Sequence, residues 1–234
     1  MKSLKKLWGY RHMLRYLHKT IYFNFRSLPF RQAIMLPIWL YRPTFISCKG
    51  RIILGGGKAK PGMIRMGFNM VSIYPRNGVT IENRGTIVFN GRCSIGNDSY
   101  LSVGSKSKVE FGDQNIATAS FKLASHCGIS FGDRVSVGWN CMFIDNDFHR
   151  LTRDDGKPVK AYGKIDVGSN VWFGNNCTVM KNTIVPDFTT IAAGTMLSGK
   201  LQTPPKAIVG NRRNTDVLQT GVWRNFDDDK IKYE

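Results

Sequence analysis

Large apolar side chains recur every six residues in the second half of the chain. The positions are Val167, Phe173, Val179, Val185, Ile191 and Leu197. A column of small or β-branched residues follows four residues behind, at Val171, Cys177, Thr183, Thr189 and Thr195. Neither the helical period of 3.6 nor the strand period of 2 produces this spacing. Short strands joined by tight corners every six residues do produce it.

The same period continues upstream in shorter runs. Its apolar positions are Phe89, Ile95 and Leu101, then Phe111, Ala117 and Leu123, then Phe131, Val137 and Phe143. The frame slips between these runs, which predicts bulged or longer corners. The gap from Phe143 to Val167 is 24 residues, a multiple of six, so the repeat keeps its register across an excursion.

The stretch VWFGNNCTVMKNTIVPDFTTIAAGTMLSGK resembles the closing coils of the hexapeptide-repeat acyltransferases. The resemblance covers roughly residues 89–211, about half of the chain. In that family six residues form one flat side, and three sides form a triangular coil. The resemblance therefore implies an all-β core: a left-handed parallel β-helix with an N-terminal helical appendage and a protruding active-site loop. We expect an appendage at residues 1–43, a β-helix domain at 44–213 and a tail or short helix at 214–234.

Length and cysteine usage narrow the class of protein. At 234 residues the chain fits one domain with an appendage. Its five cysteines are odd in number and form no CxxC pair, which argues against a disulfide framework or a zinc site. We read Cys141 and Cys177, in the small column, as packing residues. No apolar run approaches a membrane span, and basic residues interrupt the N-terminal apolar positions, so we expect a cytoplasmic protein without a signal peptide.

Positive charge is concentrated in the first third of the chain. Residues 1–81 hold fifteen Lys or Arg and no Asp or Glu, out of a net formal charge of +18. Residues 3–26 predict a basic amphipathic helix whose apolar stripe includes Leu17 and Ile21. This segment either lies on an anionic membrane, at its inner face, or packs its stripe on the end of the β-helix. Nucleic acid is disfavoured because no groove-reading motif accompanies the charge.

The excursion after Phe143 carries the candidate chemistry. It begins IDNDFH, and in the polysaccharide and sugar O-acetyltransferases of the family a DxDFH-like motif opens an extended loop. The resemblance implies that His149 is the general base that takes the proton of an acceptor hydroxyl. Either Asp145 or Asp147 would fix the imidazole tautomer. The alternative is a loop histidine satisfied by its neighbours.

The resemblance implies further contacts. His126 falls where related sugar acetyltransferases hold an acceptor-contacting carboxylate, although a structural role for it is equally open. Two other candidates for the acceptor cleft are Trp139 and Asn140. Candidates for the arm of coenzyme A are Trp172, Asn175 and Ala193, of which the tryptophan has packing as its alternative. The coenzyme phosphates call for cations, for which the candidates are Lys200, Lys206, Arg212 and Arg213.

These features indicate an acetyl-CoA-dependent O-acetyltransferase. Transfer would be direct, to a hydroxyl of a surface polysaccharide or its lipid-linked precursor. The family also implies a homotrimer, with the acyl site between neighbouring prisms. Two alternatives stay open: acetylation of a small acceptor such as a free sugar, serine or a drug, and a non-catalytic β-helix scaffold.

Overall fold

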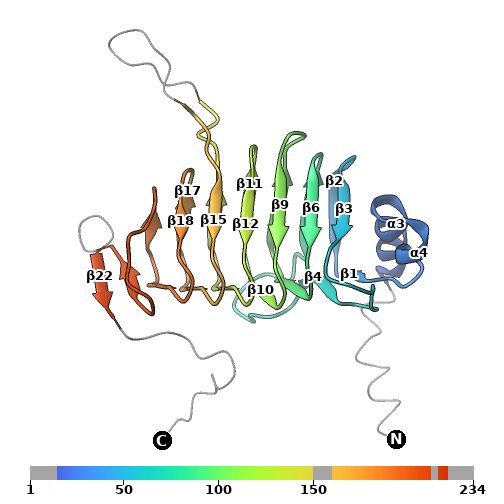
Figure 1. Cartoon of the computed structure of the whole chain (residues 1–234). Helices are drawn as coiled ribbons and strands as arrows, with labels where there is room; N and C mark the ends of the chain where they lie inside the picture. The colour runs from blue at the N-terminus through green and yellow to red at the C-terminus, as the bar shows by residue number, and fades with distance from the viewer. Residues whose placement is uncertain (1–14, 150–159, 212–215, 221–234) are drawn as a thin grey trace, which may run out of the picture.

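Three parallel sheets wind around one axis and form a long prism (Figure 1). The computed structural model describes residues 15–149, 160–211 and 216–220. The chain passes from the first sheet to the second, then to the third, and returns to the first to begin a new coil. This is the left-handed parallel β-helix that the family resemblance implies.

The strands of each sheet follow one another in chain order. The first sheet holds nine strands: β1 (Ile38–Leu40), β4 (Ile64–Phe68), β7 (Cys93–Gly96), β10 (Asn115–Ala117), β13 (Ser136–Val137), β16 (Trp172–Phe173), β19 (Thr190–Ile191), β21 (Ile208–Gly210) and β22 (Asp216–Gln219). The second holds seven: β2 (Pro43–Cys48), β5 (Val79–Asn83), β8 (Ser99–Val103), β11 (Lys122–Ser125), β14 (Met142–Ile144), β17 (Thr178–Met180) and β20 (Met196–Leu197). The third holds six: β3 (Arg51–Leu54), β6 (Thr86–Phe89), β9 (Lys108–Phe111), β12 (Ile129–Phe131), β15 (Ile165–Val167) and β18 (Ile184–Val185).

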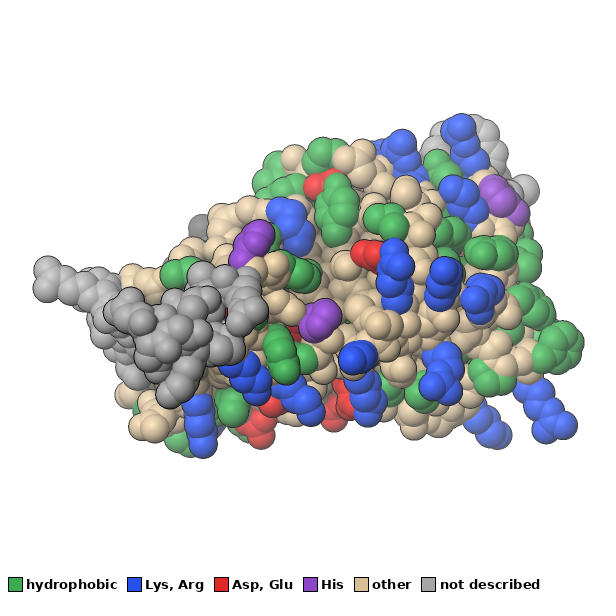
Figure 2. All heavy atoms as spheres, turned by 90° about the horizontal axis from the view of Figure 1, so that it is seen from above, with side chains coloured by type: hydrophobic (Ala, Val, Ile, Leu, Met, Phe, Trp, Pro, Cys, Tyr) green, Lys and Arg blue, Asp and Glu red, His purple; other side chains and the backbone are tan. Residues whose placement is uncertain are grey.

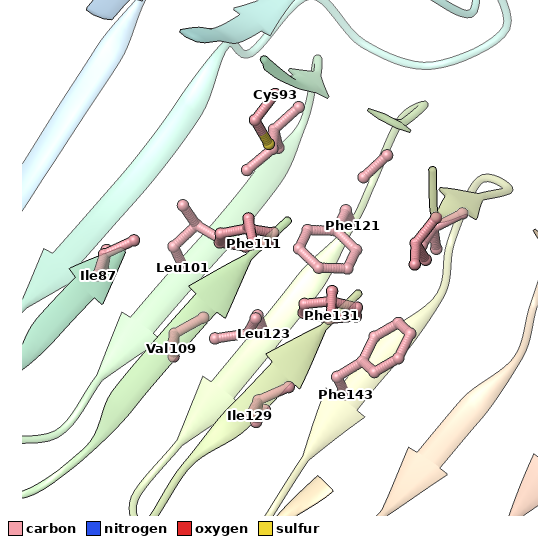
Figure 3. Close-up of a cluster of buried hydrophobic side chains, with 14 of the residues drawn as sticks. Ile87, Cys93, Leu101, Val109, Phe111, Phe121, Leu123, Ile129, Phe131 and Phe143 are labelled. Carbon is pink, nitrogen blue, oxygen red and sulfur yellow. The ribbon is translucent and has the colours of Figure 1, made fainter. Parts of the chain in front are cut away.

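The six-residue columns point into the prism. Every large apolar position from Val167 to Leu197 is at most 4% exposed, and the small column behind it is equally buried, Cys141 and Cys177 included. Aromatic rings stack along the axis: the ring centroid of Phe111 lies 5.3 Å from that of Phe89 and 5.1 Å from that of Phe131, with nearly parallel planes. Figure 3 shows Phe111 and Phe131 within this core. Burial of these rings on successive coils explains why the sixes are visible in the sequence.

The three edges of the prism differ in character, and we name them by their side chains. The amide edge joins the first sheet to the second at residues 41–42, 69–78, 97–98, 118–121, 138–141, 174–177 and 192–195. The cationic edge joins the second to the third at 49–50, 84–85, 104–107, 126–128, 145–164, 181–183 and 198–200. The aspartate edge joins the third to the first at 55–63, 90–92, 112–114, 132–135, 168–171, 186–189 and 202–207. Both slips in the six-residue repeat and the excursion fall on the cationic edge.

A ladder of side chains holds the aspartate edge together. Asp113 Oδ1 accepts the Arg92 amide at 2.7 Å, and Asp133 Oδ1 accepts the Asp113 amide at 2.7 Å. Ser169 Oγ accepts the Asp133 amide at 3.0 Å, and Asp187 Oδ1 accepts the Ser169 amide at 2.7 Å. Each corner side chain therefore satisfies a backbone donor of the coil before it.

Two helices close the N-terminal end of the prism. Helix α3 (Leu17–Ser27) packs on β1 and β2, and α4 (Phe30–Ala33) follows it. The Asn24 amide accepts the Ile38 N–H at 3.1 Å and donates to the Ile38 carbonyl at 2.7 Å. Thr20 Oγ1 accepts the Leu40 N–H at 3.2 Å. These side chains cover the free edge of β1, which blocks pairing with another chain.

The helix presents its polar side chains to the prism and its apolar stripe outward. The buried residues are Thr20, Phe23 and Asn24, whereas Leu17 and Ile21 are 38% and 40% exposed. The alternative in which the stripe packs on the β-helix is therefore wrong for these two residues. The inward face combines hydrogen bonding to β1 with the buried ring of Phe23, which stacks on Phe45 with ring centroids 5.4 Å apart. Residues 3–14 of the predicted helix lie outside the described residues. None of the helices described is long and apolar enough to cross a membrane.

The segments at both ends differ from the predicted division. Strand β1 places residues 38–40 in the first coil, inside the segment assigned to the appendage. At the other end, residues 216–219 form strand β22, which pairs antiparallel with β21. A tail or short helix was expected there. The period of six does not extend to either segment, which is why the sequence pattern did not reveal these strands.

Candidate functional site

The excursion leaves the prism after β14 and returns before β15, on the cationic edge. Its base is a short two-stranded ribbon. The Asp147 amide donates to the Ala161 carbonyl at 2.8 Å, and Asn146 and Tyr162 form an antiparallel bridge. The Gly163 amide donates to the Asp145 carbonyl at 3.0 Å. This ribbon fixes where the loop begins, and with it the position of residues 145–149.

Asp145 holds the corner of the preceding coil. It is fully buried, and Oδ1 accepts the His126 amide at 2.6 Å. Oδ2 accepts Ser125 Oγ at 2.7 Å and the amides of Cys127 and Gly128 at 3.0 and 2.7 Å. With four donors satisfied on its two oxygens, this carboxylate orders the turn at 125–128. None of these bonds goes to His149.

Asp147 forms an ion pair with Lys181 of the next coil. The same ammonium donates to the Lys160 carbonyl at 2.8 Å, which ties both ends of the excursion to one cation. The Asp147 and Lys181 side chains are 21% and 19% exposed. Neither predicted carboxylate therefore contacts His149 among the described residues.

His149 lies exposed at the start of the loop, after Phe148, whose φ is +58°. The Phe148 amide donates to Asn146 Oδ1 at 2.7 Å, which stabilises this left-handed turn. No described residue hydrogen-bonds the His149 imidazole. The His149 side chain is exposed to solvent.

His126 lies on the same edge, one coil earlier. Its ring is exposed, and its centroid is 6.4 Å from that of Tyr162 on the returning arm of the excursion. Lys160 Nζ lies 5.3 Å from the Tyr162 ring centroid. Burial, together with the charge of Asp145, raises the pKa of the neighbouring Cys127 thiol, which disfavours the thiolate. His126, Lys160 and Tyr162 form a polar rim beside the loop.

Trp139 and Asn140 lie on the amide edge rather than beside His149. Asn140 Oδ1 accepts Lys122 Nζ at 2.9 Å, and its Nδ2 donates to Asn176 Oδ1 at 2.8 Å. Strand β14 separates Asn140 from Asp145, a path of about 17 Å at the rise of an extended chain. The predicted acceptor cleft that combines Trp139, Asn140 and His149 is therefore not formed within one chain.

The candidates for the coenzyme arm do lie close together in the fold. Asn175 and Ala193 occupy successive corners of the amide edge, where the Gly194 amide donates to the Asn175 carbonyl at 2.8 Å. Trp172 is 40% exposed on β16, which leads into this edge. Small side chains at 192–194 leave the backbone of that corner accessible.

The predicted phosphate contacts do not form one cluster. Lys200 lies on the cationic edge, where it bridges to Ile184, whereas Lys206 lies on the aspartate edge. Both are exposed. Arg212 and Arg213 lie outside the described residues.

Sequence reasoning missed Lys181 and the returning arm of the excursion. Lys181 occupies the cationic-edge corner that directly follows the one with Asp147. A count of the corners on each side of the excursion would therefore have predicted that the two side chains are neighbours. Tyr162 and Lys160 precede the first strand after the loop, where no periodicity exists to place them. The sequence also gave no sign that Asp145 binds the turn at His126, because that contact joins neighbouring coils.

Comparison with known proteins supports the fold. No family model matches the chain. A protein from Klebsiella pneumoniae, described as an uncharacterized 24.8 kDa protein in cps region, is 32% identical over 106 residues. The match covers 45% of this chain and 46% of that one, so the chain spans about half the length of the curated relative it matches.

Among solved structures, the polySia-specific acetyltransferase NeuO is similar over 80% of this chain and 75% of its own, with 15% identity and a TM-score of 0.53. The polysialic acid O-acetyltransferase OatWY is similar over 82% of this chain and 90% of its own, with 15% identity and a TM-score of 0.43. The likeness to NeuO shows that this chain shares its fold with an acetyltransferase. The resemblance read from the sixes is thus confirmed at the level of the fold.

Proposed function

We propose that the protein is an acetyl-CoA-dependent O-acetyltransferase that acts on a hydroxyl of a surface polysaccharide or of its lipid-linked precursor. The observation that carries the proposal is His149, an exposed imidazole without a described partner, at the base of the only excursion from the described coils on the cationic edge. The fold shared with NeuO, named as a polySia-specific acetyltransferase, supports the reaction class. The relative from the cps region is compatible with a glycan acceptor.

His149 acts as general base in this proposal. Neutral imidazole accepts the hydroxyl proton while the acceptor oxygen attacks the thioester carbonyl of acetyl-CoA. A carbon–oxygen bond forms, the carbon–sulfur bond breaks, and the proton passes to the departing sulfur. Backbone donors near the thioester stabilise the oxyanion. Cys127 is the nearest thiol on this edge, and its raised pKa favours direct transfer over an acyl-enzyme.

Asp145 and Asp147 support the base indirectly. Asp145 fixes the corner that carries His126, and Asp147 pairs with Lys181 to hold the first arm of the excursion. Both are positioning residues, because neither contacts the imidazole among the described residues.

A homotrimer completes the site. His149 lies on the cationic edge and Asn175 and Ala193 lie on the amide edge, so the second sheet separates the base from the proposed coenzyme wall of the same chain. In a trimer, a neighbouring chain that presents its amide edge to this cationic edge brings the base of one chain to the coenzyme wall of the other. Trp139 and Asn140 of that neighbouring chain then lie beside the acceptor. Light scattering should give the trimer mass at micromolar protein.

Complementation gives a second test of the shared site. His149→Ala and Ala193→Trp chains, each inactive alone, should regain activity when co-assembled, because about a quarter of the interfaces combine two intact edges. Co-assembled chains that stay inactive would contradict a site shared between chains.

The N-terminal cap places the protein on an anionic membrane in this proposal. Exposed apolar residues gather on α3, α4 and the turn after them: Leu17, Ile21, Tyr22, Phe25, Phe30, Ile34 and Met35. Exposed cations surround them, and no carboxylate precedes Glu82. An apolar surface with a cationic rim fits the interface of an anionic bilayer.

Two substitutions of similar exposure test the membrane contact. Phe30→Ser, at a side chain 69% exposed on the cap, should weaken binding to phosphatidylserine vesicles about tenfold. Ile73→Ser, at a side chain 75% exposed on the amide edge, should leave binding unchanged. Equal effects of both substitutions would contradict docking through the cap.

The proposed reaction is tested by release of free coenzyme A from acetyl-CoA in the presence of the surface glycan. His149→Ala should lower turnover by about 10² to 10⁴, the usual contribution of a positioned base. His126→Ala is the matched control, an exposed histidine on the same edge. If His126→Ala abolished turnover while His149→Ala kept it, the base would be assigned to the wrong histidine. Activity on free monosaccharides alone would favour a small acceptor.

A further inference from the structure

The cationic edge carries a basic residue at nearly every corner of the prism. Successive corners hold Lys49, Arg84, Lys106, His126, Lys164, Lys181 and Lys200. Arg51 and Lys108 lie at the starts of the strands that follow two of these corners. Figure 2 looks onto this side of the molecule and shows Lys and Arg side chains over its length with few Asp or Glu.

Backbone contacts establish that these corners are stacked. The Arg51 amide donates to the Gly85 carbonyl at 2.8 Å, and the Gly104 amide donates to the Ser125 carbonyl at 2.8 Å. A Cβ added at Gly128 would lie 3.7 Å from Lys164 Cγ, so these two corners are adjacent. Neighbouring strands are about 4.8 Å apart, so the row of corners spans about 30 Å.

Within the described part of the chain, few carboxylates pair with these cations. Glu82, Glu110 and Asp147 pair with Arg84, Lys108 and Lys181. Hydrogen bonds from Ser102 and Arg84 hold the pKa of Glu82 below its ordinary value, against the effect of burial. The described residues provide no carboxylate within ion-pair distance of five further cations, namely Lys49, Arg51, Lys106, Lys164 and Lys200.

We propose that the cationic edge is a linear track that binds an extended polyanionic glycan and leads it past His149. The role of the track in acetyl transfer rests on the proposed function. The corners on either side of the excursion belong to the same row as His149, the proposed base. Charges repeated at the spacing of the coils match a ligand that carries a carboxylate or phosphate in each repeat. A polymer that contacts several corners gains affinity with length in a way that a short acceptor does not.

The arrangement favours a glycan over single-stranded nucleic acid. Sequence-tolerant nucleic-acid sites interleave cations with aromatic rings on which the bases stack. On this edge the exposed rings of the described residues are Phe148 and Tyr162 and the imidazoles of His126 and His149, all at the excursion or the corner beside it. Lys49, Arg84 and Lys106 have no aromatic platform between them along the row of corners. The remaining length of the track therefore offers charge without stacking.

The test compares two triple variants of equal charge change. Lys49→Gln with Arg51→Gln and Lys106→Gln removes cations of the track at corners before the excursion. The matched control, Lys58→Gln with Lys60→Gln and Arg92→Gln, removes three exposed cations from the aspartate edge. Circular dichroism and the melting temperature verify that both variants are folded.

Binding is measured with galacturonate oligomers of defined length, a polyuronate that is commercially pure. The intact protein should bind decamers at least about tenfold more tightly than trimers, with an affinity that falls as salt rises. The track variant should lose about tenfold in affinity for the decamer, and the control should bind like the intact protein. Neutral dextran of equal length should not bind.

Three results would overturn the track: equal loss of affinity in the control variant, equal affinity for trimer and decamer, or tighter binding of an oligonucleotide of the same charge. The binding readout needs no turnover. Length-dependent binding without any acetyl transfer would therefore contradict the proposed function and support the track. Acetyl transfer without length-dependent binding would support the proposed function and contradict the track.

Discussion

The cationic edge and the aspartate edge are built on the same repeat, yet they use their polar side chains in opposite ways. On the aspartate edge, corners of nearly constant length follow Phe111, Phe131 and Val167, and each Asp or Ser accepts an amide of the previous coil. On the cationic edge the corners vary in length, and most cations have no carboxylate partner among the residues that the structure describes. Regular corners hold the prism together, and irregular corners leave side chains accessible to a ligand.

Asp145 is the exception that links the two edges, because it lies on the cationic edge but serves the fold. Asp145→Asn would place an amide N–H₂ among N–H and O–H donors, and should lower the free energy of unfolding by about 3 kcal/mol. Urea denaturation measures this loss. Asp147→Asn is the control, a partly exposed ion pair whose loss should stay below about 1 kcal/mol.

If both substitutions destabilised the protein equally, the distinction between a buried hub and a surface pair would be wrong.

Two glycines, one on each edge, differ in how closely other atoms approach the position of an added Cβ. A Cβ added at Gly112 on the aspartate edge would lie 2.4 Å from the Gly132 carbonyl oxygen and 2.5 Å from Asp133 Oδ1. Gly112→Ala should therefore cost about 2 kcal/mol of unfolding free energy through overpacking.

A Cβ at Gly104 on the cationic edge would approach Ser125 O only to 3.3 Å. Gly104→Ala should change the urea midpoint little. A larger effect at Gly104 than at Gly112 would contradict the closer packing around Gly112.

Each side-chain hydrogen bond of the ladder on the aspartate edge contributes less to the free energy of unfolding than the packing at Gly112. Asp133→Ala removes the acceptor of the Asp113 amide and should cost about 1 kcal/mol, since water replaces part of the lost hydrogen bond. Asp133→Ser should recover much of this, because Ser169 fills the same role one coil later. The chemical midpoints of both variants measure the difference. An Asp133→Ser variant as unstable as Asp133→Ala would show that the rung is not a simple acceptor.

The smallest expected effect concerns the loss of stability at low pH. Burial acts to raise the pKa of Asp113, but hydrogen bonds from the Arg92 and Gln114 amides and the Gln114 side chain outweigh it and lower the pKa. A lowered pKa means that the carboxylate stabilises the fold above the ordinary carboxyl pKa of about 4, and that this contribution is lost as pH falls further. Asp113→Asn should therefore lose less stability than the intact protein between pH 5 and pH 3, measured by urea unfolding.

The sequence predicts the prism well because each coil buries the same columns. The apolar positions from Val167 to Leu197 need only local corners to define them. The edges are harder to predict, because contacts such as Asp145 with the His126 turn join residues on different coils. The helix was predicted over its described part, but the sequence left open which face it turns to the prism, since the bonds of Thr20 and Asn24 to the backbone of β1 join distant residues.

In the candidate site, too, local motifs could be predicted from the sequence, whereas contacts between coils could not. The motif around His149 marks the excursion in the sequence, while Asp145 and Asp147 have partners that no sequence pattern revealed. Trp139 and Asn140 were expected near His149, and they lie on another edge because β14 runs between them. Only a count of residues per sheet, which the slips of the sixes obscure, would have separated these groups.

The central claim is that the two edges divide chemistry from stability, and one paired measurement tests it. Turnover of acetyl-CoA with the surface glycan and the free energy of unfolding are measured for His149→Ala and Asp133→Ala. We predict that His149→Ala loses about 10² to 10⁴ in turnover with unchanged stability, and that Asp133→Ala loses about 1 kcal/mol of stability with unchanged turnover. A His149→Ala protein that turns over acetyl-CoA at the rate of the intact protein would contradict the account.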